Sequence, residues 1–137
     1  ELKQHAEAYR IELVKNVATK QSSAEDTSVL LLDAAGLFKA LLDDIQAGLP
    51  TGFIAQYFHD AFVRVLVEMA ELVRAVYGIS IVALGGGVFM NRYLTEQALI
   101  QLQERGFTVA MNKDLPPNDA SISYGQAVLG WQAQNKE

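Results

Sequence analysis

The chain has no cysteine, and this absence narrows the kinds of site that it can hold. Without thiols it can form neither a disulfide nor a thiolate zinc site, and two histidines are too few for a histidine-rich metal centre. No apolar run reaches membrane-spanning length, and the charged first ten residues, ELKQHAEAYR, do not resemble a signal peptide. These features predict no membrane partner and permit a reducing cytosol, and we expect a cytoplasmic protein.

Basic residues are also scarce, since 11 Lys and Arg stand against 16 Asp and Glu and give a net charge of −5. They are scattered, whereas nucleic-acid binding requires clustered positive charge, so we expect no nucleic-acid partner. Hydrophobic residues make up 50% of the 137, which is enough for the core of a single domain. The first residue is not methionine and lies in a helix-type sequence. We expect residues 1–137 to be one domain of a larger multidomain protein.

Hydrophobic periodicity and helix-ending residues predict a chain of alternating helices and strands. Helices are expected over residues 1–20, 37–47, 51–77, 90–105 and 119–131, and strands over 29–32, 79–84 and 107–111. One apolar stripe of the third helix, from Ile54 to Val76, is its predicted buried side. The strand at 79–84 lacks alternation, which predicts burial on both faces. The expected fold class is α/β, with a small, mostly parallel, three-stranded sheet flanked by helices.

Three consecutive glycines, Gly85, Gly86 and Gly87, follow the second expected strand and precede a helix. Such a loop lets a phosphate approach backbone N–H groups at the positive end of the helix dipole. Neither GxGxxG nor a Walker motif is present, so a tight turn without a ligand explains the glycines equally well. Asn91, just after them, can either bind a nucleotide or bond the local backbone.

A second polar feature, Pro116-Pro117-Asn118-Asp119, follows the next expected strand. Ligands in open α/β sheets bind at the carboxyl ends of the strands, so this turn and the glycines could together hold a nucleotide phosphate and its metal. The Asp119 carboxylate suits Mg²⁺, or a transition metal shared with histidines. The alternative is that Asp119 caps the last helix.

These motifs resemble the C-terminal part of the HypF family of hydrogenase maturation carbamoyltransferases. The specific matches are GGGVFMN at residues 85–91 and PPND at 116–119, followed by Gly125 and Gln126; residues 54–62 match fairly and residues 8–13 weakly. The resemblance implies a Kae-like domain of the actin/Hsp70/sugar-kinase type, which is ribonuclease H-like and has two lobes. This chain would be the second, C-terminal nucleotide-binding lobe.

The resemblance also implies a function in making the cyanide ligand of [NiFe]-hydrogenase. In the family, other domains use carbamoyl phosphate and ATP to form carbamoyl-adenylate. The two lobes then pass the carbamoyl group to the C-terminal cysteine of a partner protein, which dehydrates it. Those domains and the first lobe, with its pair of metal-binding histidines, lie outside this chain. The chain alone is therefore expected to be inactive.

Site residues follow from the resemblance position by position. The glycines at 85–87 would cradle phosphates, Asn91 would contact the nucleotide, and Glu12 would reach the ribose. Asp119 would be the ligand that this lobe gives to a divalent metal ion, completed by ligands outside the chain. No catalytic residue is assigned. The chain departs from the family at residues 120–121, Ala-Ser in place of two glycines, and at residues 7–8, Glu-Ala in place of Gly and Gln.

Two other functions remain open from the residues. One is a lobe of an antibiotic-type O-carbamoyltransferase or of the enzyme that makes threonylcarbamoyl-adenosine in tRNA. The other is a non-catalytic interaction domain, which predicts that no nucleotide binds. Phe89 and the PPND turn favour the HypF family over its relatives.

Overall fold

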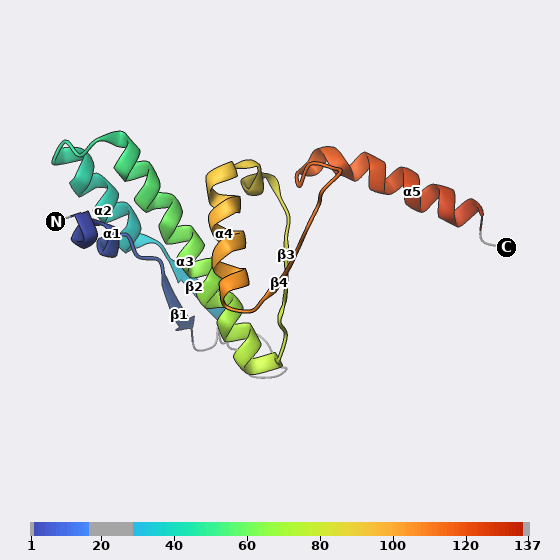
Figure 1. The fold of residues 1–137 in the computed structure, drawn as a ribbon, viewed down its shortest axis with the longest axis horizontal. Helices are drawn as coiled ribbons and strands as arrows, with labels where there is room; N and C mark the ends of the chain where they lie inside the picture. Colours follow the sequence, from blue (N-terminus) through green and yellow to red (C-terminus); the bar gives the residue numbers. More distant parts are fainter. Residues whose placement is uncertain (1, 17–28, 136–137) are drawn as a thin grey trace. The chain divides into compact units, whose positions relative to one another are not determined.

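The computed structural model describes residues 2–16 and 29–135 (Figure 1). Its elements in chain order are α1 (Leu2–Ala8), β1 (Glu12–Asn16), β2 (Val29–Asp33), α2 (Ala35–Gln46), α3 (Thr51–Tyr77), β3 (Ile81–Leu84), the 3₁₀ helix η1 (Gly87–Met90), α4 (Arg92–Glu104), β4 (Thr108–Met111), the 3₁₀ helix η2 (Asp119–Ser121) and α5 (Ile122–Gln134). The chain divides into two compact units, Glu1–Met69 and Ala70–Glu137, with α3 running through the boundary. The α/β class predicted from the sequence is confirmed.

The first unit packs α1, α2 and the first part of α3 with an antiparallel pair of strands, β1 and β2. Glu12 of β1 lies opposite Asp33 of β2. Its core consists of Tyr9, Ile11, Leu37, Ala40, Tyr57, Ala61 and Val65. At the centre of this core, the rings of Tyr9 and Tyr57 lie 5.6 Å apart in a tilted arrangement that favours aromatic contact.

The predicted helix over residues 1–20 is wrong in its second half. The helix ends at Ala8, and Glu12–Asn16 is a strand; residues 17–20 lie outside the described part of the chain. Arg64 of α3 helps to end the helix, because its guanidinium donates to the carbonyl oxygens of Ala6 and Tyr9, at 3.1 Å each. Carbonyls at a helix end otherwise lack partners. Pairing with β2 then outweighs the helical periodicity that the sequence suggested.

A polar cluster lies beside this core. The Nδ1 atom of His5 is 2.7 Å from an oxygen of Asp44, whose side chain is only 7% exposed. The second oxygen of Asp44 and the Tyr9 hydroxyl are both buried, and neither has a hydrogen-bond partner among the described residues. Burial, and then the nearby Asp44 carboxylate, raise the pKa of Tyr9 to about 12. The cluster thus joins α1, α2 and the segment after α1.

The second unit contains the parallel strands β3 and β4, with Ile81 opposite Thr108 and Leu84 opposite Met111. The crossover between them is α4, which buries Leu94, Ala98 and Leu102. The last part of α3 is tied to the start of β4, because the Arg74 guanidinium lies 4.1 Å from the centre of the Phe107 ring. This β–α–β arrangement brings the carboxyl ends of β3 and β4 to one edge.

Helix ends agree with the sequence wherever glycine was expected to end them. Gly48, Gly78 and Gly106 follow α2, α3 and α4 with φ values of +73°, +70° and +78°. These left-handed conformations are ones that glycine adopts without a steric penalty.

Three further expectations differ from the structure. The described residues contain four strands in two separate pairs, rather than one sheet of three. β3 is not buried on both faces, because Ile81 is 66% exposed while Leu84 is buried. The expected apolar stripe of α3 is only partly buried: Val65 is, whereas Val76 is 65% exposed. Parts of both α3 and β3 that the apolar pattern predicted to be buried are therefore exposed in this chain.

Candidate functional site

The glycine loop and the Pro-Pro-Asn-Asp turn meet at the carboxyl edge of β3 and β4. The Gly86 N–H donates to the Pro117 carbonyl oxygen. A Cβ atom built on Gly87 would lie 3.9 Å from the Cβ of Asn118, which is ordinary van der Waals contact. Parallel strands place their C-terminal loops at one edge, which is where ligands bind in open α/β sheets.

Of the three glycines, only Gly86 has a backbone conformation that requires glycine. Its φ of +102° and ψ of 161° are strained for any residue with a Cβ. The tight-turn explanation therefore accounts for Gly86. Gly85 and Gly87 do not have such a φ, and added Cβ atoms would not clash there. Backbone conformation gives no reason for glycine at these two positions, whereas close approach of a ligand does.

Two backbone N–H groups of this loop have no acceptor among the described residues. Gly87 and Val88 are the first residues of η1, so their N–H groups have no partner within that helix. No other hydrogen bond engages them within residues 2–16 and 29–135. The Gly86 N–H, in contrast, is used by Pro117. The loop as folded thus offers the N–H groups of Gly87 and Val88 to an anion, with Gly86 holding the loop in place.

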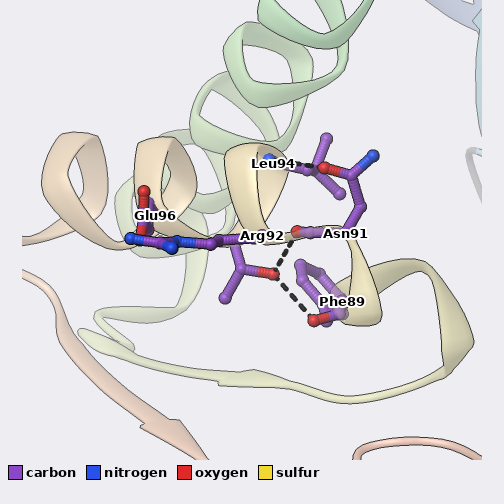
Figure 2. A network of polar contacts seen from close by, with 6 residues as sticks. Phe89, Asn91, Arg92, Leu94 and Glu96 are labelled. Atoms are coloured by element: carbon purple, nitrogen blue, oxygen red, sulfur yellow. Dashed lines mark hydrogen bonds and ion pairs between the residues drawn. The ribbon is translucent and has the colours of Figure 1, made fainter.

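Asn91 is the N-cap of α4, as Figure 2 shows. Its Oδ1 atom accepts a hydrogen bond of 3.1 Å from the Leu94 N–H. Of the two roles that the sequence left open, the local-backbone role is therefore present. A contact between Asn91 and a nucleotide stays a prediction.

Thr95 is a site-positioning residue that the sequence analysis missed. Its hydroxyl lies 2.9 Å from the carbonyl oxygens of both Phe89 and Asn91, and its side chain is largely buried. This contact ties the end of η1 to the first turn of α4. Its only signal in the sequence was a threonine four residues after the cap, the spacing at which a hydroxyl reaches back along a helix.

Asp119 is not the cap that the alternative explanation required. The N-cap position of α5 is Ser121, which makes no side-chain cap hydrogen bond, and the residue that caps η2 is Asn118, whose Oδ1 accepts from the Ala120 N–H at 3.1 Å. Asp119 is the first residue of η2, and its exposed carboxylate has no hydrogen-bond or ion-pair partner in the described chain. Ser121 donates its hydroxyl to the Pro116 carbonyl oxygen at 2.6 Å. The turn is therefore held by Asn118 and Ser121, and the Asp119 carboxylate remains available.

Glu12 lies in the first unit, at the start of β1. It borders a cleft of about 520 Å³ whose other charged lining residues are Arg10, Arg64 and Glu68. The glycine loop, Asn91 and Asp119 all belong to the second unit. A contact between Glu12 and the ribose of the same nucleotide stays a prediction.

The described residues contain neither a complete metal-binding cluster nor a membrane-spanning helix. Nowhere in residues 2–16 and 29–135 do three or more histidine or acidic side chains come together as a metal-binding set. Asp119 could thus supply one oxygen ligand but not a whole metal site. No helix in the described ranges is both long and apolar enough to cross a membrane.

Comparison with known proteins identifies the family. The profile described as the second subdomain of the Kae1-like domain of carbamoyltransferases, HypF_C_2, matches residues 1–126. The chain belongs to the HypF carbamoyltransferase family. Carbamoyltransferase HypF of Synechocystis sp. is 35% identical over 105 residues, which cover 77% of this chain. A HypF homolog of Cupriavidus necator is 36% identical over 100 residues, or 71% of this chain.

Solved HypF structures share the fold. A full-length HypF in a phosphate- and nucleotide-bound form matches 96% of this chain with a TM-score of 0.73 and 31% identity. HypF of T. kodakarensis matches 94% with a TM-score of 0.60 and 27% identity. The chain spans 16% of each of these two proteins, and 13% and 25% of the Synechocystis and Cupriavidus relatives. The resemblance read from the two motifs is thereby confirmed.

Proposed function

We propose that this chain is the C-terminal nucleotide-binding lobe of a cytoplasmic HypF carbamoyltransferase. In this proposal the complete enzyme transfers a carbamoyl group from carbamoyl-adenylate to the C-terminal cysteine of a partner protein, on the way to the cyanide ligand of [NiFe]-hydrogenase. The family is one of enzymes, and a solved relative is described as binding phosphate and nucleotide. The remaining domains, including the first lobe, would lie outside residues 1–137.

The observation that carries the proposal is the pair of glycines on either side of Gly86. Gly86 is explained by its positive φ, but Gly85 and Gly87 are not. Beside them lie the N–H groups of Gly87 and Val88, which have no acceptor in the described chain. Bare backbone with available donors fits the phosphates of ATP or carbamoyl-adenylate.

Asp119 fits the divalent metal ion that the resemblance implies. Its carboxylate is exposed, has no partner in the described residues, and belongs to the turn that Pro117 fastens to the glycine loop. It would hold a divalent cation together with ligands from the other lobe. The bound cation would supply positive charge beside the phosphate oxygens.

The test is Asp119→Asn in the full-length protein. Asn is nearly the same size and Asn118 remains as the cap, so the melting temperature should stay close to that of the parent. Without the negative charge, metal content and carbamoyl transfer to a thiol peptide should both fall at least about tenfold. Asp114→Asn removes the same charge from the preceding loop and is the matched control. If Asp119→Asn keeps its metal and its transfer activity, the ligand role is wrong.

A further inference from the structure

Ser121 occupies the N-cap position of α5 but does not cap that helix. Serine is a preferred residue at this position because its oxygen normally accepts from a backbone N–H of the first helical turn. At Ser121 that bond is absent, and the backbone is already helical, with φ of −86° and ψ of −7°. Asn91 is different, since it has an extended backbone and caps α4 by accepting from the Leu94 N–H. The Ser121 side chain is therefore used for a contact other than capping.

That contact is with the turn that carries Asp119. The Ser121 hydroxyl donates to the Pro116 carbonyl oxygen at 2.6 Å, five residues back along the chain. The Ser121 N–H also bonds within the turn, to the Asn118 carbonyl oxygen at 3.2 Å. Asp119 lies inside the segment that these two bonds close. The hydroxyl thus restricts the conformations that the backbone around Asp119 can adopt.

The two prolines of the turn explain why a side chain has this task. Proline has no N–H, so neither Pro116 nor Pro117 can donate a backbone hydrogen bond that would fix the turn. Their carbonyl oxygens are held instead. The Gly86 N–H donates to the Pro117 carbonyl from the glycine loop, and the Ser121 hydroxyl donates to the Pro116 carbonyl from within the turn. Gly86 therefore fastens the turn to the glycine loop, and Ser121 closes the turn on itself.

The Asp119 carboxylate is not restrained by any contact of its own, because it has no hydrogen bond or ion pair in the described chain. A metal ligand binds well when neighbouring groups hold it in place before the metal arrives. For Asp119 that restraint has to come through the backbone. The Asn118 cap on one side and the Ser121 hydroxyl on the other supply it.

We propose that Ser121 is a positioning residue for the metal ligand Asp119, because its hydroxyl closes the turn and holds the carboxylate where a divalent cation binds. Ser121 itself contacts neither the cation nor the nucleotide; it acts through the Pro116 carbonyl. This inference rests on the proposed function, since it requires Asp119 to be the ligand that this lobe supplies.

Mn²⁺ binding to the full-length protein, followed by electron paramagnetic resonance without ATP, tests the inference. Ser121→Ala removes the hydroxyl but no cap bond, so the melting temperature should stay within about 2 °C of the parent. Its Mn²⁺ affinity should nevertheless fall about tenfold. Ser121→Thr keeps a hydroxyl and should restore most of that affinity. Ser123→Ala is the matched control and should bind Mn²⁺ like the parent, because Ser123 is exposed and makes no side-chain hydrogen bond in the described chain.

ATP affinity, measured by calorimetry in the presence of EDTA, separates positioning from general damage to the site. In Ser121→Ala the glycine loop keeps the Gly86 bond to Pro117, so metal-free ATP binding should equal that of the parent. Equal losses of Mn²⁺ and ATP affinity, or failure of Ser121→Ala to fold, would mean that the hydroxyl supports the fold and not Asp119 in particular. Either result would overturn the inference. Parental Mn²⁺ affinity in Ser121→Ala, or an equal loss in Ser121→Thr, would do the same.

Asp119→Asn in the same assays keeps the two proposals apart. Loss of Mn²⁺ in Asp119→Asn beside full binding in Ser121→Ala would leave the ligand role standing and remove only the positioning role. Full Mn²⁺ binding in Asp119→Asn would remove the ligand role and the inference with it.

Discussion

The two units of this chain differ in how their residues are used. The first unit has a packed core around Tyr9, Leu37 and Tyr57, and even its buried Asp44 pairs with His5. The second unit holds the glycine loop and the Asp119 turn at a sheet edge, where most side chains are exposed. In the first unit side-chain packing dominates, whereas in the second the shape of the loops depends on a few specific hydrogen bonds.

Those few bonds are the Gly86 contact to Pro117, the Asn91 and Asn118 caps, and the Thr95 and Ser121 hydroxyls. None of them requires a large apolar side chain. Substitutions in the core of the first unit should therefore change stability, whereas substitutions in these loops of the second unit should change binding more than stability.

The largest effect is expected from Leu37→Ala, since Leu37 is fully buried in the first unit. Removing its side chain should lower the free energy of unfolding by about 2–5 kcal/mol through lost burial and a residual cavity. Leu42→Ala, in the same helix at 56% exposure, is the control and should cost no more than about 0.5 kcal/mol. Chemical denaturation followed by circular dichroism measures both values. Equal losses for the two variants would contradict the assigned core.

Alkaline pH should destabilise the first unit through Tyr9. Burial and Asp44 raise its pKa to about 12 from the ordinary 10.0, so the folded chain keeps a proton that the unfolded chain loses. The stability due to this difference is present below pH 10 and disappears as the pH rises to about 12. It amounts to at most about 3 kcal/mol. In unfolding measurements from pH 9 to 12, Tyr9→Phe should show a shallower decline than the parent. Tyr124→Phe, on the exposed α5, should follow the parent throughout.

A smaller change in stability should separate the two roles of Asn91. Asn91→Asp keeps a cap of equal quality, so the free energy of unfolding should stay within about 0.5 kcal/mol, but it places a negative charge beside the glycine loop. Repulsion between the carboxylate introduced at residue 91 and a phosphate held by the neighbouring glycine loop should weaken ATP binding about tenfold or more. Asn91→Ala should instead cost about 1 kcal/mol of stability with less effect on binding. Unchanged ATP affinity in Asn91→Asp would mean that Asn91 is a cap alone.

Features fixed by short stretches of sequence could be predicted. Gly48, Gly78 and Gly106 end their helices with a positive φ. Tolerance of a positive φ belongs to glycine itself, so it can be read from the sequence without knowledge of distant contacts. The meeting of the glycine loop and the proline turn also followed from sequence, since two parallel strands joined by one helix bring their ends together. The motifs at residues 85–91 and 116–119 also predicted the HypF family, which the comparisons confirm.

Features that depend on distant partners could not be predicted. Glu12–Asn16 is a strand because β2 pairs with it and Arg64 ends the preceding helix, and neither contact is visible in local periodicity. Asn118 and Asp119 are both good caps, and only the backbone geometry decides that Asn118 is the one used. The same limit applies to β3, whose continuous apolar sequence predicted two buried faces.

The central claim is that the glycine loop of the second unit binds nucleotide phosphate, and Gly87→Ala tests it most directly. An alanine there has an allowed φ and an ordinary contact with Asn118, so the full-length protein should fold with an unchanged melting temperature. Its Cβ should nevertheless hinder the phosphate and reduce ATP affinity in calorimetry by about tenfold or more. Gly52→Ala, with open space around it in α3, should leave affinity unchanged. Equal ATP affinity in Gly87→Ala and the parent, or no ATP binding by the parent, would contradict the account.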